Sequence, residues 1–130
     1  MELPNPIEIR NDISKVIENV DFLVEFLSTK DKVSFSEFNS QWHTINLELL
    51  NIWHRIYYLT MTDRKYSKAH EKLRKILIKM LIDTNEIEKK HSKGRSIFWE
   101  SIFQQGKYRK DLINHFKDVS KQLEKIHKSI

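Results

Sequence analysis

The sequence predicts an all-α fold: one domain spanning residues 1–130, arranged as an up-down-up-down four-helix bundle. Only two glycines and two prolines occur in 130 residues, too few turn residues for a fold of many short strands. Apolar residues recur at intervals of three and four through long segments, the period of a helix with one buried face. Hydrophobic residues make up 39% and charged residues 32%, a composition typical of a chain that buries its own core.

The first helix is predicted to begin at Asn5 and to end near Ser28. The Asn5 side chain can accept a hydrogen bond from an unpaired amide at the helix start. Pro6 suits the first helical position, because its missing N–H would have no partner there. Glu8 follows in the first turn. The apolar positions expected to face the core are Ile9, Ile13, Val16, Ile17, Val20, Leu23, Val24 and Leu27.

The second helix is predicted to begin with a capping box. Ser34 and Glu37 are spaced so that each side chain can bond the other's backbone amide, and Val33 and Phe38 can form a hydrophobic staple. A second apolar stripe widens this helix's buried face, which predicts contact with two neighbouring helices. The main stripe is Phe38, Trp42, Ile45, Leu49, Ile52, Ile56 and Leu59, and the second is Phe35, Leu50, Trp53 and Tyr57.

The third helix is predicted to follow a turn at Thr60–Asp63, with Thr62 or Asp63 as its cap, and to end near Gly94. Its expected inner face is Tyr66, Ala69, Leu73, Ile76, Leu77, Met80, Leu81 and Ile87. We then expect a short extra helix at about residues 96–105, ended by Gly106, before the last helix at Tyr108–His127. Three long helices plus a helical hairpin is the alternative architecture. The inner face of the last helix is predicted as Tyr108, Leu112, Phe116, Val119, Leu123 and Ile126.

Charge is distributed unevenly along the chain. The net charge is +5, but residues 1–62 carry five Lys/Arg against nine Asp/Glu, whereas residues 63–130 carry eighteen against nine. The C-terminal half is therefore strongly basic. Such an asymmetry is informative about binding partners rather than about the fold.

The basic half predicts a surface for nucleic acid or for an acidic protein partner, including the acidic half of another copy of the chain. Lysine arrays bind phosphate backbones because each neutralised phosphate releases counterions. Tyr66, Trp99 and Tyr108 are candidates for stacking on bases. Interspersed acids such as Glu71 leave an ordinary solvated helix face as the alternative. The predicted binding residues are Lys65, Lys68, Lys72, Lys75, Lys79, Arg109 and Lys110.

A second candidate site is the apolar segment before the last helix. Phe98, Trp99 and Phe103 cannot all face one narrow core, and exposed aromatic clusters mark protein interfaces. The alternative is that the bundle closes over them.

Several function classes find no support in the sequence. The chain has no cysteine, and its histidines lack the spacing of metal ligands, so we expect no metal and no cofactor. No Gly-rich phosphate loop or Ser/His/Asp order is present. No segment approaches the length of a membrane span or has the pattern of a targeting signal, which predicts a cytoplasmic or nuclear protein.

Two Arg/His pairs suggest an enzymatic alternative. Arg64 precedes His70, and Arg109 precedes His115, by the same interval. This spacing resembles the Arg-x4-6-His signature of HEPN-domain ribonucleases, which are small helical bundles. The resemblance implies a metal-independent ribonuclease in which Arg109 and His115 act together on RNA, with the histidine in acid/base chemistry. It covers only this short motif, and Lys110 and Phe116 depart from the polar and small residues that are frequent there. The primary hypothesis is a non-enzymatic binding or scaffold subunit of a larger assembly.

Overall fold

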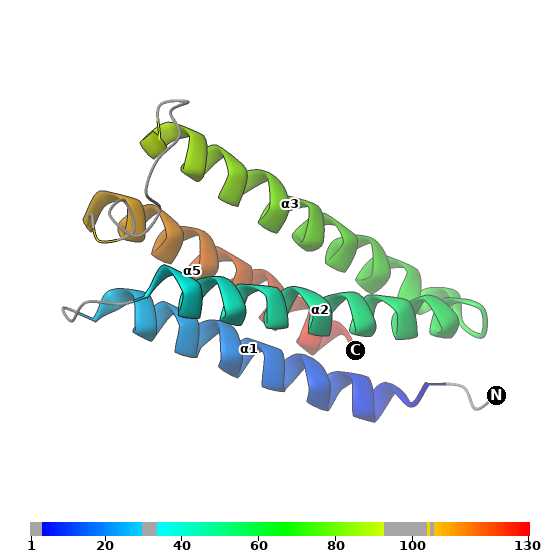
Figure 1. Cartoon of the computed structure of the whole chain (residues 1–130). Coiled ribbons are helices and arrows are strands. Elements are labelled where there is room, and N and C mark those ends of the chain that lie inside the picture. The colour runs from blue at the N-terminus through cyan, green and yellow to red at the C-terminus, as the bar shows by residue number, and fades with distance from the viewer. Residues whose placement is uncertain (1–3, 30–33, 93–103, 105) are drawn as a thin grey trace.

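The computed structural model describes residues 4–29, 34–92, 104 and 106–130. Four α-helices form a bundle, as predicted, and the described residues contain no strand (Figure 1). The elements in chain order are α1 (Pro6–Ser28), α2 (Phe35–Thr60), the 3₁₀ turn η1 (Arg64–Tyr66), α3 (Ser67–Ser92) and α5 (Gly106–Ser129).

Neighbouring helices run antiparallel, so the chain passes up and down the bundle four times (Figure 1). α1 packs against α2 and α5, and α3 packs against the same two helices from the other side. Each helix therefore has two neighbours, which leaves one side of each helix facing outward. None of the helices in the described ranges has the length and apolar character needed to cross a membrane.

The predicted starts of the first two helices are confirmed. Asn5 Oδ1 accepts a hydrogen bond from the Ile7 amide at 2.8 Å, and Pro6 occupies the first turn of α1. Ser34 Oγ accepts from the Glu37 amide at 3.4 Å at the start of α2. These bonds satisfy amides that have no partner within the helix.

The path into α3 differs in detail from the prediction. Asp63 Oδ1 accepts from the Lys65 amide at 3.0 Å, and this cap begins the turn η1, which continues into α3. Gly106, predicted to end a short helix, instead begins α5. That predicted short helix at about 96–105, the helix end at Gly94 and the staple residue Val33 lie outside the described residues.

The buried core follows the predicted stripes closely. Leu81 is the clear error on α3, because its side chain is 57% exposed. It lies at the outer edge of the stripe, where the wide apolar face of α3 continues past the core. The buried hydrophobic residues are Ile9, Ile13, Val16, Val20, Leu23, Leu27, Phe38, Ile45, Leu49, Ile52, Ile56, Leu59, Ala69, Leu73, Ile76, Met80, Tyr108, Leu112, Phe116, Val119, Leu123 and Ile126.

The second stripe of α2 meets α3 through Trp53 and Tyr57, but the prediction was wrong for Leu50, which is 37% exposed because it lies outside the contact between the two helices. Trp53 stacks on His70 with ring centroids 4.7 Å apart and planes 19° apart, and Tyr57 lies against the same imidazole at 5.7 Å. Burial against these rings lowers the pKa of His70.

Polar contacts at the rim of the core set how α1 lies against its neighbours. On the α2 side, Arg55 forms an ion pair with Asp12 at 2.7 Å. On the α5 side, Ser120 Oγ donates to Asp21 Oδ1 at 2.7 Å. Directional contacts of this kind favour one helix register over others in an otherwise apolar interface.

Candidate functional site

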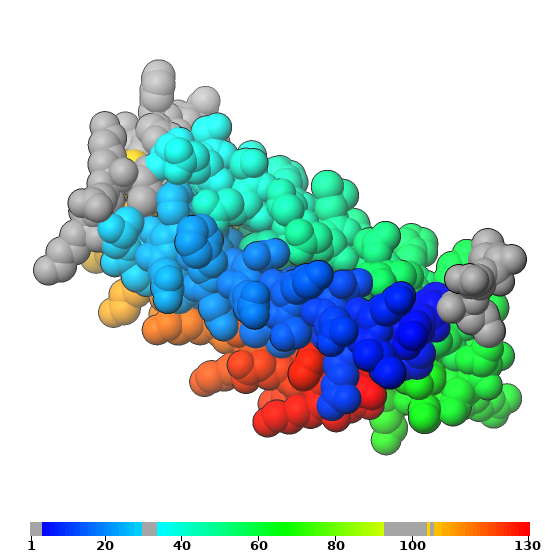
Figure 2. Space-filling view, turned by 90° about the horizontal axis from the view of Figure 1, so that it is seen from below, coloured from blue at the N-terminus to red at the C-terminus, as the bar shows by residue number. Residues whose placement is uncertain are grey.

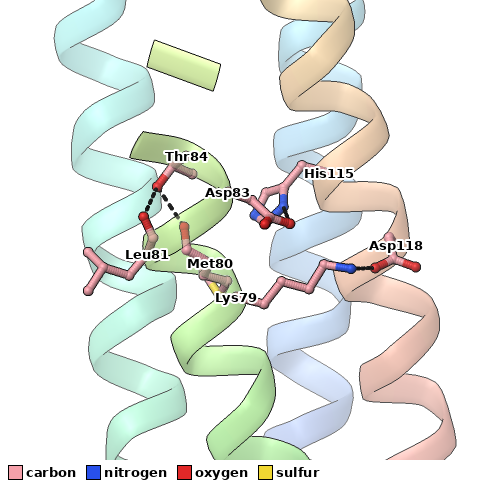
Figure 3. A network of polar contacts seen from close by, with 7 residues as sticks. All are labelled: Lys79, Met80, Leu81, Asp83, Thr84, His115 and Asp118. Carbon is pink, nitrogen blue, oxygen red and sulfur yellow. Dashed lines mark hydrogen bonds and ion pairs between the residues drawn. The ribbon is translucent and has the colours of Figure 1, made fainter. Parts of the chain in front are cut away.

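The contact between α3 and α5 is lined by opposite charges in a fixed order. Lys79 of α3 pairs with Asp118 of α5, and Asp83 of α3 meets His115 of α5 one turn further along (Figure 3). The Lys79 hydrogen bond lowers the pKa of Asp118, and the same bond raises the pKa of Lys79. This line of contacts is called the α3–α5 seam below.

Asp111 extends the seam toward the end of α3. Its Oδ2 lies 2.8 Å from His91 Nε2 and 3.1 Å from Lys90 Nζ. The hydrogen bond with His91 lowers the pKa of this carboxyl most, and the hydrogen bond with Lys90 lowers it further. Residue numbers rise along α3 as they fall along α5, so the seam fixes the antiparallel register of the two helices.

His115 is the most buried polar group of the seam. Its side chain is 2% exposed, and its Nδ1 lies 3.2 Å from Asp83 Oδ2. An ionised carboxylate can only accept a hydrogen bond, so the proton of the neutral ring belongs on Nδ1. Burial lowers the pKa of His115, and Asp83 opposes that shift only in part. The Nε2 atom is buried without a hydrogen-bond partner among the described residues.

The register concentrates positive charge at one end of the seam. Residues 63–75 and 119–130, at the start of α3 and the end of α5, carry nine Lys/Arg against three Asp/Glu. Residues 76–92 and 106–118, at the other end, carry seven against five. Figure 2 shows the red C-terminal end of α5 beside the green atoms around η1 and the start of α3.

Five exposed lysines make up what we call the cationic cluster. Lys72 lies seven residues before Lys79, and Lys125 lies seven residues after Asp118, so both stand about 10 Å beyond that ion pair in the same direction. Within the described part of the chain, none of the five lysines forms an ion pair. The members are Lys68, Lys72 and Lys75 of α3 and Lys121 and Lys125 of α5.

Two of the predicted binding lysines near the cluster already have contacts within the chain. Lys79 is committed to Asp118. Lys65 lies in η1, where its Nζ is 3.8 Å from an Asp63 oxygen and 5.1 Å from the centre of the Tyr66 ring. Lys65 keeps most of its side chain exposed, so it can still add to the positive potential at this end.

Arg109 and Lys110 do not join the other predicted basic residues. They lie at the opposite end of α5, where an Arg109 Nη1 atom donates to the Thr29 carbonyl oxygen at 3.3 Å and Lys110 is exposed. The predicted stacking role of Tyr108 is wrong, because its ring is 3% exposed and burial raises its pKa to about 12. A buried ring has no face to offer a base.

The residues of the HEPN-like motif are not brought together. Five residues lie between Arg109 and His115, so the two residues are about 9 Å apart along the helix and on different sides of it. Arg109 reaches α1 at Thr29, whereas His115 faces Asp83 on α3. In the other pair, Arg64 lies in η1 and His70 is stacked on Trp53.

The predicted aromatic interface residues Phe98, Trp99 and Phe103 lie outside the described residues.

Nothing in the sequence distinguishes Lys121 and Lys125 from the other Lys and Arg residues among the seven of the last helix. Only the register of α5 against α3 shows that these two lysines lie beside the start of α3. Among the described residues, no group of His, Asp and Glu is arranged to hold a metal ion.

Comparisons of the chain with known protein families, with curated proteins and with solved structures return no match.

Proposed function

We propose that this protein is a non-enzymatic binding subunit whose cationic cluster contacts a polyanionic partner. The partner that we propose is nucleic acid. The carrying observation is that five exposed lysines from two helices converge at one end of the α3–α5 seam, without ion pairs in the described part of the chain. Unpaired lysines held on rigid helices can neutralise phosphates without first giving up an internal partner.

The acids of the seam strengthen this interpretation. Asp118 and Asp111 are paired with Lys79 and Lys90 of the neighbouring helix, and Asp83 lies one turn beyond Lys79 on the side away from the cluster. Their charges therefore do not neutralise the cluster, which lies beyond the last of these contacts. An ordinary solvated helix face would have its acids and bases spread along its whole length.

A binding experiment with paired variants tests the proposal. Fluorescence anisotropy with a short DNA duplex and a short RNA duplex compares wild type with Lys68→Glu/Lys72→Glu. Lys107→Glu/Lys110→Glu, on exposed residues at the opposite end, is the matched control because it makes the same change in net charge. We expect the first variant to lose at least about tenfold in affinity and the control to lose much less.

An acidic partner protein is the other occupant of the same cluster, and a poly-glutamate peptide serves as its probe. Tight binding of the peptide with no binding of either duplex at low salt would replace nucleic acid by an acidic protein. Equal loss in the two variants would contradict the cluster as the binding site. The same RNA samples, kept in EDTA, report on ribonuclease activity, and we expect the RNA to stay intact.

A further inference from the structure

The outward side of α3 carries a stripe of exposed residues that neither the core nor the seam uses, and only Lys75 belongs also to the cationic cluster. Figure 1 shows α3 at the edge of the bundle, with α2 and α5 on its inner side. Ile78 is 42% exposed and Ile82 is 49% exposed at its centre. The full stripe is Glu71, Lys75, Ile78, Ile82, Glu86 and Lys89, at steps of three and four residues that keep it on one face of the helix.

The stripe is complementary to itself when it is read backwards. Glu71 and Lys89 lie equally far from Met80 along the helix. The distances of Lys75 and Glu86 from Met80 differ by only one residue. The two isoleucines flank Met80. An antiparallel second copy of α3 would therefore place a lysine opposite every glutamate and an isoleucine opposite each isoleucine. A parallel copy would place like charges opposite each other.

We propose that α3 is a two-fold self-association surface, through which two copies of this chain pair with their α3 helices antiparallel. Two-fold interfaces use the same patch on both subunits, so a self-complementary pattern is the property that such a patch needs. The stripe from Glu71 to Lys89 is about 27 Å long, enough for several turns of helix–helix contact.

Contacts within the chain leave the stripe available to a second copy. Glu71 forms an ion pair within its own helix, with Arg74 Nη1 at 3.3 Å, and both side chains remain about half exposed to solvent. A carboxylate has capacity for a further donor from a second copy. The exposed Leu81, which lies beside Ile78 and Ile82, widens the apolar centre. Burial of these three side chains removes apolar surface from water at the middle, while the charged pairs set the direction.

Sedimentation velocity from micromolar to submillimolar protein tests the pairing. We expect wild type to form a dimer. The single variants Lys75→Glu and Glu86→Lys, both at exposed positions, should each raise the dimer Kd by about tenfold or more. Each substitution puts like charges opposite each other at two places in the dimer. The double variant Lys75→Glu/Glu86→Lys should restore the wild-type Kd. Lys121→Glu on α5 is the control and should leave the Kd unchanged.

Mixing the two single variants is the decisive arm. One variant carries glutamate at both positions and the other carries lysine at both, so the mixed dimer regains both opposite-charge contacts. We expect the mixture to dimerise more tightly than either variant alone. A wild-type monomer at all concentrations, or a dimer insensitive to the single reversals, would overturn the proposal. Circular dichroism of each variant establishes that it is folded before its mass is measured.

Discussion

The imidazole of His115 on α5 lies 3.2 Å from the carboxylate of Asp83 on α3, with its side chain only 2% exposed. This contact joins two helices. Burial between them favours the neutral ring, although the Asp83 carboxylate alone would favour the imidazolium. The same pair therefore links the packing of α3 on α5 to pH.

Stability is predicted to fall as the pH drops below about 6.5. The pKa of His115 is lower in the folded protein than the ordinary 6.5, so the unfolded chain binds more protons between the two values. The contribution of the neutral ring is complete above 6.5 and is lost as the pH falls to the folded pKa. His70 shifts in the same direction and adds to the effect.

Chemical denaturation at several pH values measures this effect. We expect His115→Gln to unfold with a shallower dependence on pH between about 7 and 5, because the glutamine does not titrate. His54→Gln, at an exposed position of α2, is the control. If wild type and His115→Gln have parallel pH profiles, the buried ring is not the titrating group.

The Lys79–Asp118 pair is predicted to contribute little to stability despite its central place in the seam. Both side chains are about 40% exposed, so solvent screens the attraction. A double-mutant cycle with Lys79→Gln and Asp118→Asn should give a coupling free energy of about 0.2–1 kcal/mol that falls with added salt. Lys68→Gln with Asp118→Asn, a pair without a contact, should show no coupling. A coupling of several kcal/mol would show that the pair is effectively buried.

Phe116 is predicted to be one of the most important core residues. It is fully buried, and its ring meets the edge of Phe38 at 6.1 Å, which joins α5 to α2 across the bundle. Phe116→Ala should lower the free energy of unfolding by about 3–5 kcal/mol. Phe22→Ala makes the same chemical change at a residue that is 60% exposed, and it should stay within about 0.5 kcal/mol of wild type. Similar losses in the two variants would contradict this packing.

The cap at the start of α1 gives a prediction on a smaller scale. Asn5→Ala should cost about 1 kcal/mol, because the Ile7 amide loses its 2.8 Å partner. Asn5→Gly should cost only a few tenths of a kcal/mol, since glycine leaves that amide open to water. Thermal unfolding monitored by circular dichroism separates the two. An Asn5→Ala variant as stable as wild type would mean that the side-chain oxygen is not the stabilising group.

The sequence was sufficient for the four long helices and for most of the core. Asn5 and Ser34 mark helix starts by local chemistry, and the apolar stripes have one period throughout, so neither depends on distant residues. The edge of a stripe is less well determined, and Leu81 shows why: an apolar residue there packs or stays exposed according to how close the neighbouring helix comes.

The site could be predicted only in part. Periodicity places Lys68, Lys72 and Lys75 on one side of a helix, but it does not show which part of the last helix lies beside them. That information is in the seam, where Lys79 meets Asp118 and brings Lys125 to the same end. Arg109 fails to join the cluster for the same reason, because the antiparallel register carries it to the far end.

The salt dependence of nucleic-acid binding tests the cationic cluster most directly. With four or five lysines in contact with phosphates, the slope of log affinity against log salt for a DNA duplex should be about −4. Lys68→Gln/Lys72→Gln should make the slope shallower by about two, and Lys107→Gln/Lys110→Gln should leave it unchanged. A duplex that does not bind at low salt, or a slope that the first variant leaves unchanged, would contradict the account.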